Sequence, residues 1–160
     1  MRKLLLALIL AMIVPQPALA ADTVFVMRHL QKADGADPPL SAEGAANARA
    51  VADMLARSGI KAIFATPTRR AMETALPLAA RLGLTVMPYD PSKPERLAAA
   101  VAAMPGAVLV VGHSNTVPDL VARFGGKQAV TLGEEDYGTV FVITHDDGEV
   151  SEIKISTSRR

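Results

Sequence analysis

The sequence predicts an α/β fold, a three-layer α/β/α sandwich with a mostly parallel sheet and an antiparallel edge hairpin. Two uninterrupted apolar runs, Val24-Phe25-Val26-Met27 and Val108-Leu109-Val110-Val111, are typical of strands that are buried on both faces. Strand-like and helix-like segments then alternate along the chain up to residue 126, an order that favours helices on both faces of a parallel sheet. The last stretch contains two strand patterns around Asp147-Gly148, a tight hairpin signal.

The first elements follow from local signals. Thr23–Met27 is the first predicted strand, and the segment from residue 31 to 40 is rich in glycine, proline and charge, as loops are. Ser41 is the expected N-cap of a helix that runs to about Arg57, because small and aliphatic residues recur behind it at helical spacing.

The middle of the chain repeats this order. A second short strand is expected at 61–65. Thr66 followed by Pro67 has the form of an N-cap and first helical residue, and the predicted helix continues to about Leu82, where Gly83 ends it.

The remaining elements complete the sandwich. We expect a strand at 84–87, a proline-rich loop at 88–94, a helix at 94–103, a strand at 107–111, a helix at 117–124, and hairpin strands at 139–144 and 149–155. No internal repeat, low-complexity segment or domain linker is evident.

The first twenty residues have the layout of a secretory signal peptide. Arg2 and Lys3 form a positive start, Leu4–Val14 is an apolar core, and Ala18-Leu19-Ala20 is a small-residue cleavage site. The apolar run is shorter than the roughly 20 residues of a membrane span, although an uncleaved anchor helix is the alternative. We therefore expect a signal peptide at 1–20, a single domain at 21–160, a periplasmic or secreted location, and no membrane anchor after cleavage.

Composition excludes several classes of function. Without Arg2 and Lys3, the 17 basic residues become 15 against 16 acidic ones, so the mature chain is nearly neutral and a nucleic-acid partner is not expected. The chain has no cysteine, which excludes disulfides, thiolate nucleophiles and cysteine-ligated zinc.

Chemically versatile side chains follow the two apolar strands. Arg28 and His29 come directly after the first, and His113 comes directly after Gly112 at the end of the second. Because ligands bind beyond the carboxyl ends of strands in open α/β sheets, we expect these groups to converge there, together with Arg70 from the helix after Thr66. Guanidinium groups bind phosphate bidentately, a neutral imidazole is nucleophilic near neutral pH, and a second imidazole can stabilise the charge that develops on phosphoryl oxygens.

Three motifs carry a family resemblance. Met27-Arg28-His29, the run Thr66-Pro67-Thr68-Arg69-Arg70-Ala71-Met72-Glu73-Thr74-Ala75, and Gly112-His113-Ser114-Asn115-Thr116 resemble the three signatures of the histidine phosphatase superfamily, which has the phosphoglycerate mutase-like fold. Their order and spacing fit that family across essentially all of the mature chain.

The resemblance implies a role for each residue. His29 would be the phosphate-accepting nucleophile, Arg28 and Arg70 would bind phosphate, and His113 would stabilise the transition state and also bind phosphate. Arg70 rather than Arg69 occupies the family position, because it directly precedes Ala71. Ser114 is a further candidate phosphate ligand or helix cap, and no metal or cofactor is expected.

Two features depart from the family pattern. Leu30 stands where glycine or alanine is usual, so we expect it to narrow the pocket mouth or make it more apolar. The acid that protonates the leaving group is not marked by a motif, and the candidates are Asp90 and Glu95.

The expected function is hydrolysis of phosphomonoesters through a phosphohistidine on His29, without a metal. A small-molecule or glycan phosphate ester would be the substrate. The alternatives are a protein-phosphohistidine phosphatase and a catalytically silent phosphate-binding domain of the same fold.

Overall fold

The computed structural model describes residues 21–155 except residue 146, so the predicted signal peptide at 1–20 lies outside the described residues. The described strands form one sheet in the order β3-β2-β4-β1-β5-β6. They are β1 Thr23–Arg28, β2 Ile60–Ala65, β3 Val86–Pro88, β4 Ala107–Gly112, β5 Thr139–Thr144 and β6 Val150–Lys154. β1 to β4 pair in parallel, whereas β5 and β6 are antiparallel, which confirms the predicted sheet.

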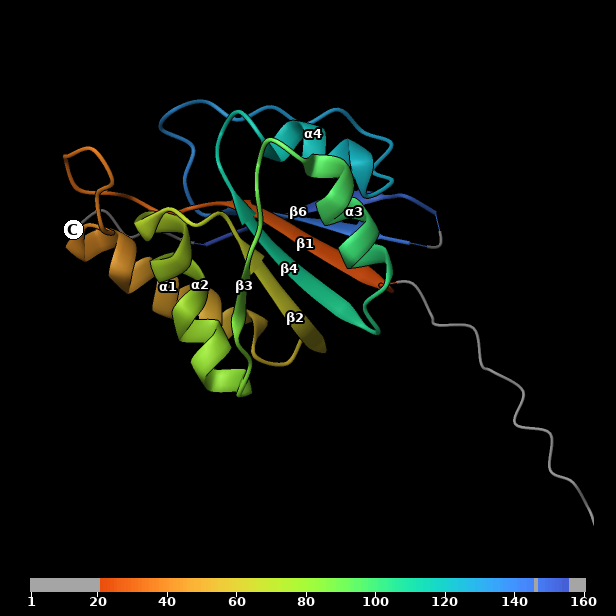
Figure 1. The fold of residues 1–160 in the computed structure, drawn as a ribbon, viewed down its shortest axis with the longest axis horizontal. Helices are drawn as coiled ribbons and strands as arrows, with labels where there is room; N and C mark the ends of the chain where they lie inside the picture. The colour runs from red at the N-terminus through yellow and green to blue at the C-terminus, as the bar shows by residue number, and fades with distance from the viewer. Residues whose placement is uncertain (1–20, 146, 156–160) are drawn as a thin grey trace, which may run out of the picture.

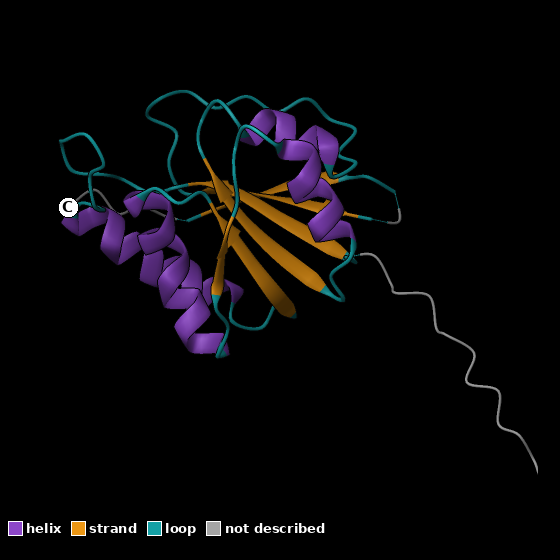
Figure 2. Cartoon of the chain, viewed as in Figure 1, coloured by secondary structure: helices purple, strands orange, loops and turns teal. Residues whose placement is uncertain are grey.

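Helices cover both faces of the sheet. They are α1 Ala42–Leu55, α2 Arg69–Leu82, α3 Pro94–Ala102 and α4 Val117–Arg123. α1 and α2 lie side by side on one face, and α3 and α4 lie on the other (Figures 1 and 2). The predicted three-layer sandwich is therefore confirmed.

β1 is buried between these helical layers. Phe25 and Met27 pack into the core below α1 and α2, whereas Val24 and Val26 pack into the core below α3 and α4. Successive side chains of a strand point to opposite faces, so an entirely apolar β1 contributes to both cores. This burial fixes the direction in which β1 delivers the residues at its carboxyl end.

The local signals at helix ends are confirmed in two places. The side chain of Ser41 accepts a hydrogen bond from the backbone N–H of Gly44, 3.1 Å away, and caps α1. Gly83 ends α2 with a left-handed backbone (φ +67°), where glycine has no steric penalty.

The predicted start of α2 at Thr66 and Pro67 is wrong. The helix begins two residues later, with Thr68 as its N-cap residue and Arg69 as its first helical residue. The backbone N–H of Arg69 donates to Asp37 Oδ1 at 3.0 Å, so a carboxylate from the loop after β1 satisfies this helix end. Thr66 is consequently available for another contact, described below.

None of the helices in the described part of the chain is long and apolar enough to cross a bilayer.

Candidate active site

The pairing of β1 with β4 brings the two histidine segments together. Arg28 lies opposite Gly112 in the parallel register, and the backbone N–H of His29 donates to the Gly112 carbonyl at 2.9 Å. The rings of His29 and His113 meet edge to face, with 5.3 Å between their centroids. Both imidazoles therefore stand at the carboxyl edge of the parallel strands, as the strand pattern predicts.

The tautomer of His29 follows from its two contacts. The Nδ1 atom lies 2.8 Å from the carbonyl oxygen of Leu30, and only a protonated ring nitrogen can donate to that oxygen. The Nε2 atom accepts a hydrogen bond from Arg70 Nε at 3.1 Å. The neutral ring thus presents an Nε2 lone pair to the guanidinium of Arg70, where a phosphate group bound by Arg70 would lie.

Burial keeps His29 neutral. Only 3% of the residue is exposed, and its desolvation lowers the pKa to about 4, assisted by the nearby charges of His113, Arg70 and Arg28. At neutral pH the ring is therefore unprotonated at Nε2. An imidazole in this state has the lone pair that nucleophilic attack requires.

His113 is held by a residue that the sequence analysis assigned to another role. Its Nε2 atom lies 2.9 Å from the hydroxyl oxygen of Thr66, which is fully buried. Burial, followed by the charges of Arg70 and Arg28, lowers the pKa of His113. Thr66 therefore belongs to the site, although its sequence context indicates a helix cap.

Arg28 is a buried cation that points into the same region. Its Nη1 atom donates to the carbonyl oxygens of Gly133 at 2.9 Å and Glu134 at 2.5 Å. Its Nη2 atom donates to Glu134 Oε2 at 3.2 Å and to the Tyr137 hydroxyl at 3.3 Å. The Nε atom is buried and has no acceptor among the described residues. A buried N–H without an acceptor is unfavourable, and an anionic ligand would supply one.

The two neighbouring arginines of α2 have different surroundings. Arg70 is 20% exposed, contacts His29 and lies 3.6 Å from Asp37 Oδ1. Arg69 is 59% exposed and pairs with Glu73 at 2.8 Å on the helix surface. The structure thus brings Arg70, and not Arg69, to the histidines.

The loop between α4 and β5, residues 124–138, covers part of the site. Within it, Glu134 Oε1 accepts a hydrogen bond from the Ser114 hydroxyl at 2.8 Å, while Oε2 pairs with Arg28. The ring of Tyr137 lies 6.1 Å from that of His29 and packs on the Arg28 guanidinium. Glu134 and Tyr137 carry no signal in the sequence, because three consecutive acidic residues in a loop resemble an ordinary solvated turn.

The two predicted acid candidates are not brought into contact with the histidines. The Asp90 carboxylate accepts hydrogen bonds from Ser92, and these bonds, together with Lys93, lower its pKa to about 2. Glu95 is exposed in the first turn of α3. Among the described residues, neither carboxylate forms a hydrogen bond or ion pair with Arg28, His29, Arg70 or His113. The role assigned to them stays a prediction.

The structure does not place the Leu30 side chain at the pocket mouth, where it was expected. Its side chain is fully buried in the core below α1 and α2, together with Met27 and Leu55. The backbone N–H of Leu30 donates to the Thr74 hydroxyl at 3.0 Å, which fixes the segment against α2. The bulk of Leu30 therefore fills the core and leaves the mouth of the site unchanged.

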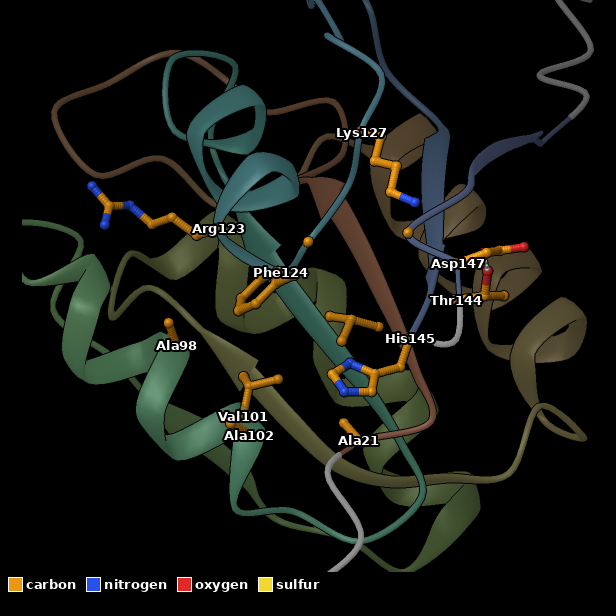
Figure 3. A pocket seen from close by; sticks show the side chains of 13 residues that line it. Ala21, Ala98, Val101, Ala102, Arg123, Phe124, Lys127, Thr144, His145 and Asp147 are labelled. Carbon is orange, nitrogen blue, oxygen red and sulfur yellow. Dashed lines mark hydrogen bonds between the residues drawn. The ribbon is translucent and has the colours of Figure 1, made fainter.

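A cavity of about 350 Å³ lies elsewhere in the molecule (Figure 3). It is lined by Ala21 and Val24 at the start of β1, by Val101 of α3, and by His145 in the turn after β5. These positions belong to the amino-terminal end of β1, opposite to the edge that carries His29. In the described chain, no group of three or more His, Asp or Glu side chains is arranged to hold a metal ion.

Comparisons with known proteins agree with this geometry. Residues 26–91 match the family model described as histidine phosphatase superfamily (branch 1), a segment that includes Arg28, His29 and Arg70. The protein histidine phosphatase SixA in complex with tungstate has a similar structure, with a TM-score of 0.64 at 21% identity over 82% of this chain and 94% of SixA. The mycobacterial glucosyl-3-phosphoglycerate phosphatase Rv2419c has a TM-score of 0.65 at 19% identity over 84% and 97% of the two chains.

A short segment is also similar to a curated protein. It is 60% identical over 47 residues to the uncharacterized protein Rv0525 of Mycobacterium tuberculosis and covers 29% of this chain. The matched segment spans only 23% of the length of that relative. The family match covers residues 26–91, and the solved structures show a shared fold. Residues 26–91 thus resemble the histidine phosphatase superfamily, and the described chain shares its fold with the two solved phosphatases named above.

Proposed function

We propose that the protein is a metal-independent phosphatase that hydrolyses phosphomonoesters through a phosphohistidine on His29. The observation that carries the proposal is the state of His29: Nδ1 donates to the Leu30 carbonyl, so the Nε2 lone pair faces Arg70. A phosphate bound by Arg70 and by the unpaired Nε–H of Arg28 would place its phosphorus next to that lone pair.

Each neighbouring group has a function in this reaction. The guanidinium groups of Arg28 and Arg70 would neutralise the phosphoryl oxygens, and His113 would donate a hydrogen bond to an oxygen that gains charge in the transition state. Ser114, at the start of the segment between β4 and α4, would be a further ligand. Water then attacks the phosphohistidine, inorganic phosphate leaves, and His29 returns to its neutral form.

Acid-quench labelling tests the proposal. The protein, His29→Ala and the matched control His145→Ala are mixed with a phosphate-labelled ester, and the quenched protein is examined for an acid-labile, base-stable phosphate. We expect the adduct and turnover in wild type and in His145→Ala, and neither in His29→Ala. Turnover without an adduct, or turnover that a chelator abolishes, would contradict the proposed mechanism.

A protein-phosphohistidine substrate is the second candidate. The observation in its favour is the likeness to SixA, which spans 94% of that chain. A phosphoramidate releases an imidazole, so its hydrolysis depends less on a leaving-group acid than that of an alkyl ester does. Parallel assays with a phosphohistidine peptide and a sugar phosphate separate the two substrate classes. Binding of phosphate without turnover of either would indicate the catalytically silent domain.

We also propose export to the periplasm or beyond, with a small-molecule or glycan phosphate ester as the substrate. The support is the composition of residues 1–20, which has the layout of a cleaved signal peptide.

A further inference from the structure

The Glu134 carboxylate stands among the phosphate-binding candidates. Its Oε2 atom lies 3.2 Å from Arg28 Nη2, and its Oε1 atom accepts a hydrogen bond from the Ser114 hydroxyl at 2.8 Å. Arg28 directly precedes His29, and Ser114 directly follows His113. Glu134 therefore touches a neighbour of each histidine from a loop that belongs to neither motif.

We propose that Glu134 is the residue that protonates the leaving oxygen of the substrate. This inference rests on the proposed function and assigns the leaving-group acid to a residue other than the predicted candidates Asp90 and Glu95. The side chain is 80% exposed, so it lies at the solvent side of the site, where the alcohol portion of an ester leaves. Arg28 also donates a hydrogen bond to the backbone carbonyl oxygen of Glu134, which keeps the carboxylate of this residue near the site.

The balanced reaction has two steps. In the first, the lone pair of His29 Nε2 forms the N–P bond while the P–O ester bond breaks. The electron pair of that bond stays on the ester oxygen, which takes the proton from the Glu134 carboxyl and leaves as the alcohol. In the second, the Glu134 carboxylate takes a proton from water as the water oxygen bonds to phosphorus. The N–P bond then breaks, its electron pair returns to Nε2, and inorganic phosphate is released.

The protonation of Glu134 depends on what occupies the site. In the free protein the hydrogen bond from Ser114 and the charge of Arg28 lower its pKa, with a smaller effect of His29. A phosphate bound at Arg28 would offset the charge of that guanidinium and add negative charge beside the carboxylate, and both changes would raise the pKa of Glu134. Asp90 differs, because Ser92 and Lys93 of its own loop hold it ionised whatever the site contains.

The test uses a series of phosphomonoesters whose leaving groups range from nitrophenol to a simple alkyl alcohol. A nitrophenolate leaves without a proton, whereas an alkoxide does not. For Glu134→Gln we expect kcat/KM to fall about 100-fold or more with the alkyl ester and less than about 10-fold with the nitrophenyl ester, as loss of a general acid predicts. Glu135→Gln, which removes the adjacent carboxylate, is the matched control and should behave as wild type with both esters.

Other outcomes would overturn the assignment. Equal losses with both esters would show that Glu134 only positions Arg28, and unchanged or faster turnover would show that Glu134 takes no part in the reaction. A leaving-group dependence in Asp90→Asn or Glu95→Gln instead would assign the acid to that residue.

The adduct assay separates this inference from the proposed function. If the function is right, Glu134→Gln still forms the phosphohistidine from the nitrophenyl ester, whatever its effect on alkyl esters. Absence of the adduct in wild type would refute the proposed function itself.

Discussion

The carbonyl oxygen of Leu30, rather than a side chain, sets the tautomer of His29. Because every residue has this carbonyl, position 30 does not need a particular side chain to keep Nε2 unprotonated. The Leu30 side chain is instead fully buried in the core. Stability and the proposed activity therefore depend on different atoms of the same residue.

Leu30→Ala separates these two contributions. We expect the free energy of unfolding to fall by about 2–5 kcal/mol, since a buried leucine is replaced by a cavity. KM for a phosphomonoester should remain near the wild-type value while the protein is folded. Urea unfolding and steady-state kinetics at low temperature measure both. A large change in KM without loss of stability would place the side chain at the pocket mouth after all.

The two adjacent arginines of α2 provide a matched pair of variants. Arg70 donates to His29, whereas Arg69 pairs with Glu73 on the exposed face of the helix. Arg70→Ala should lower kcat/KM about 100- to 1,000-fold, the usual loss when a donor to the transition state is removed. Arg69→Ala should leave kcat/KM close to wild type, because an exposed ion pair of this kind contributes little. Similar losses in both variants would argue against the assignment of Arg70.

The low pKa of His29 predicts how the free protein responds to acid. The ring stays neutral as the pH falls through 6.5 and takes up a proton only near pH 4, where the Nε2 lone pair is lost. An NMR titration of the imidazole signals, assigned by their absence in His29→Ala, should give a midpoint near 4. A midpoint near 6.5 would mean that burial does not lower the pKa of His29.

At the scale of elements, α1 packs directly against the segment that follows β1. A Cβ atom on Gly44 would overlap the backbone carbonyl oxygen of Gln31. That oxygen already accepts a hydrogen bond from the backbone N–H of Ser41. Close approach of the two backbones is what requires glycine in this buried helical turn.

Gly44→Ala should therefore destabilise the protein even though alanine is the better helix former. Helix propensity alone favours the substitution by about 1 kcal/mol, whereas overpacking costs about 1–3 kcal/mol. The midpoint of urea unfolding should fall. Ala46→Gly, on the exposed side of the same helix, measures the propensity effect without the overlap. A higher midpoint for Gly44→Ala would show that α1 moves away without cost.

Local signals predict most element boundaries but fail at the start of α2. Thr66-Pro67 has the composition of a helix start, yet the helix begins at Arg69, which is capped by Asp37 from 32 residues earlier in the chain. A cap supplied by tertiary structure leaves no trace in the residues beside the helix. The true role of Thr66, its contact with His113, also depends on the pairing of β2 with β4.

At the scale of the whole molecule, the predictable part of the site is the part that follows buried strands. Arg28, His29 and His113 are marked by apolar runs, and the strand order places them at one edge. Glu134 and Tyr137 lie in a loop whose path depends on tertiary contacts, among them the hydrogen bonds from Arg28 and the antiparallel pairing of β5 with β1. Within the run Glu134-Glu135-Asp136, sequence alone does not distinguish the carboxylate that meets Arg28 from its neighbours.

The proposed export of the protein has a direct check. Cleavage after Ala20 would leave Ala21 as the first residue of the mature chain, next to β1. The intact mass of protein recovered from the periplasm should correspond to residues 21–160. A mass that includes the first twenty residues would instead support an uncleaved anchor.

The strand order also determines how much of the chain must be present before the proposed site is complete. β1 carries the proposed nucleophile, but its two neighbours in the sheet, β4 and β5, begin at Ala107 and Thr139. A chain emerging from the ribosome, or threaded unfolded through a membrane, has His29 long before it has the partners of β1. Because such distant pairings form slowly, an incomplete chain holds a histidine and an arginine but not the assembled site. The proposed activity would therefore require the chain at least through β5.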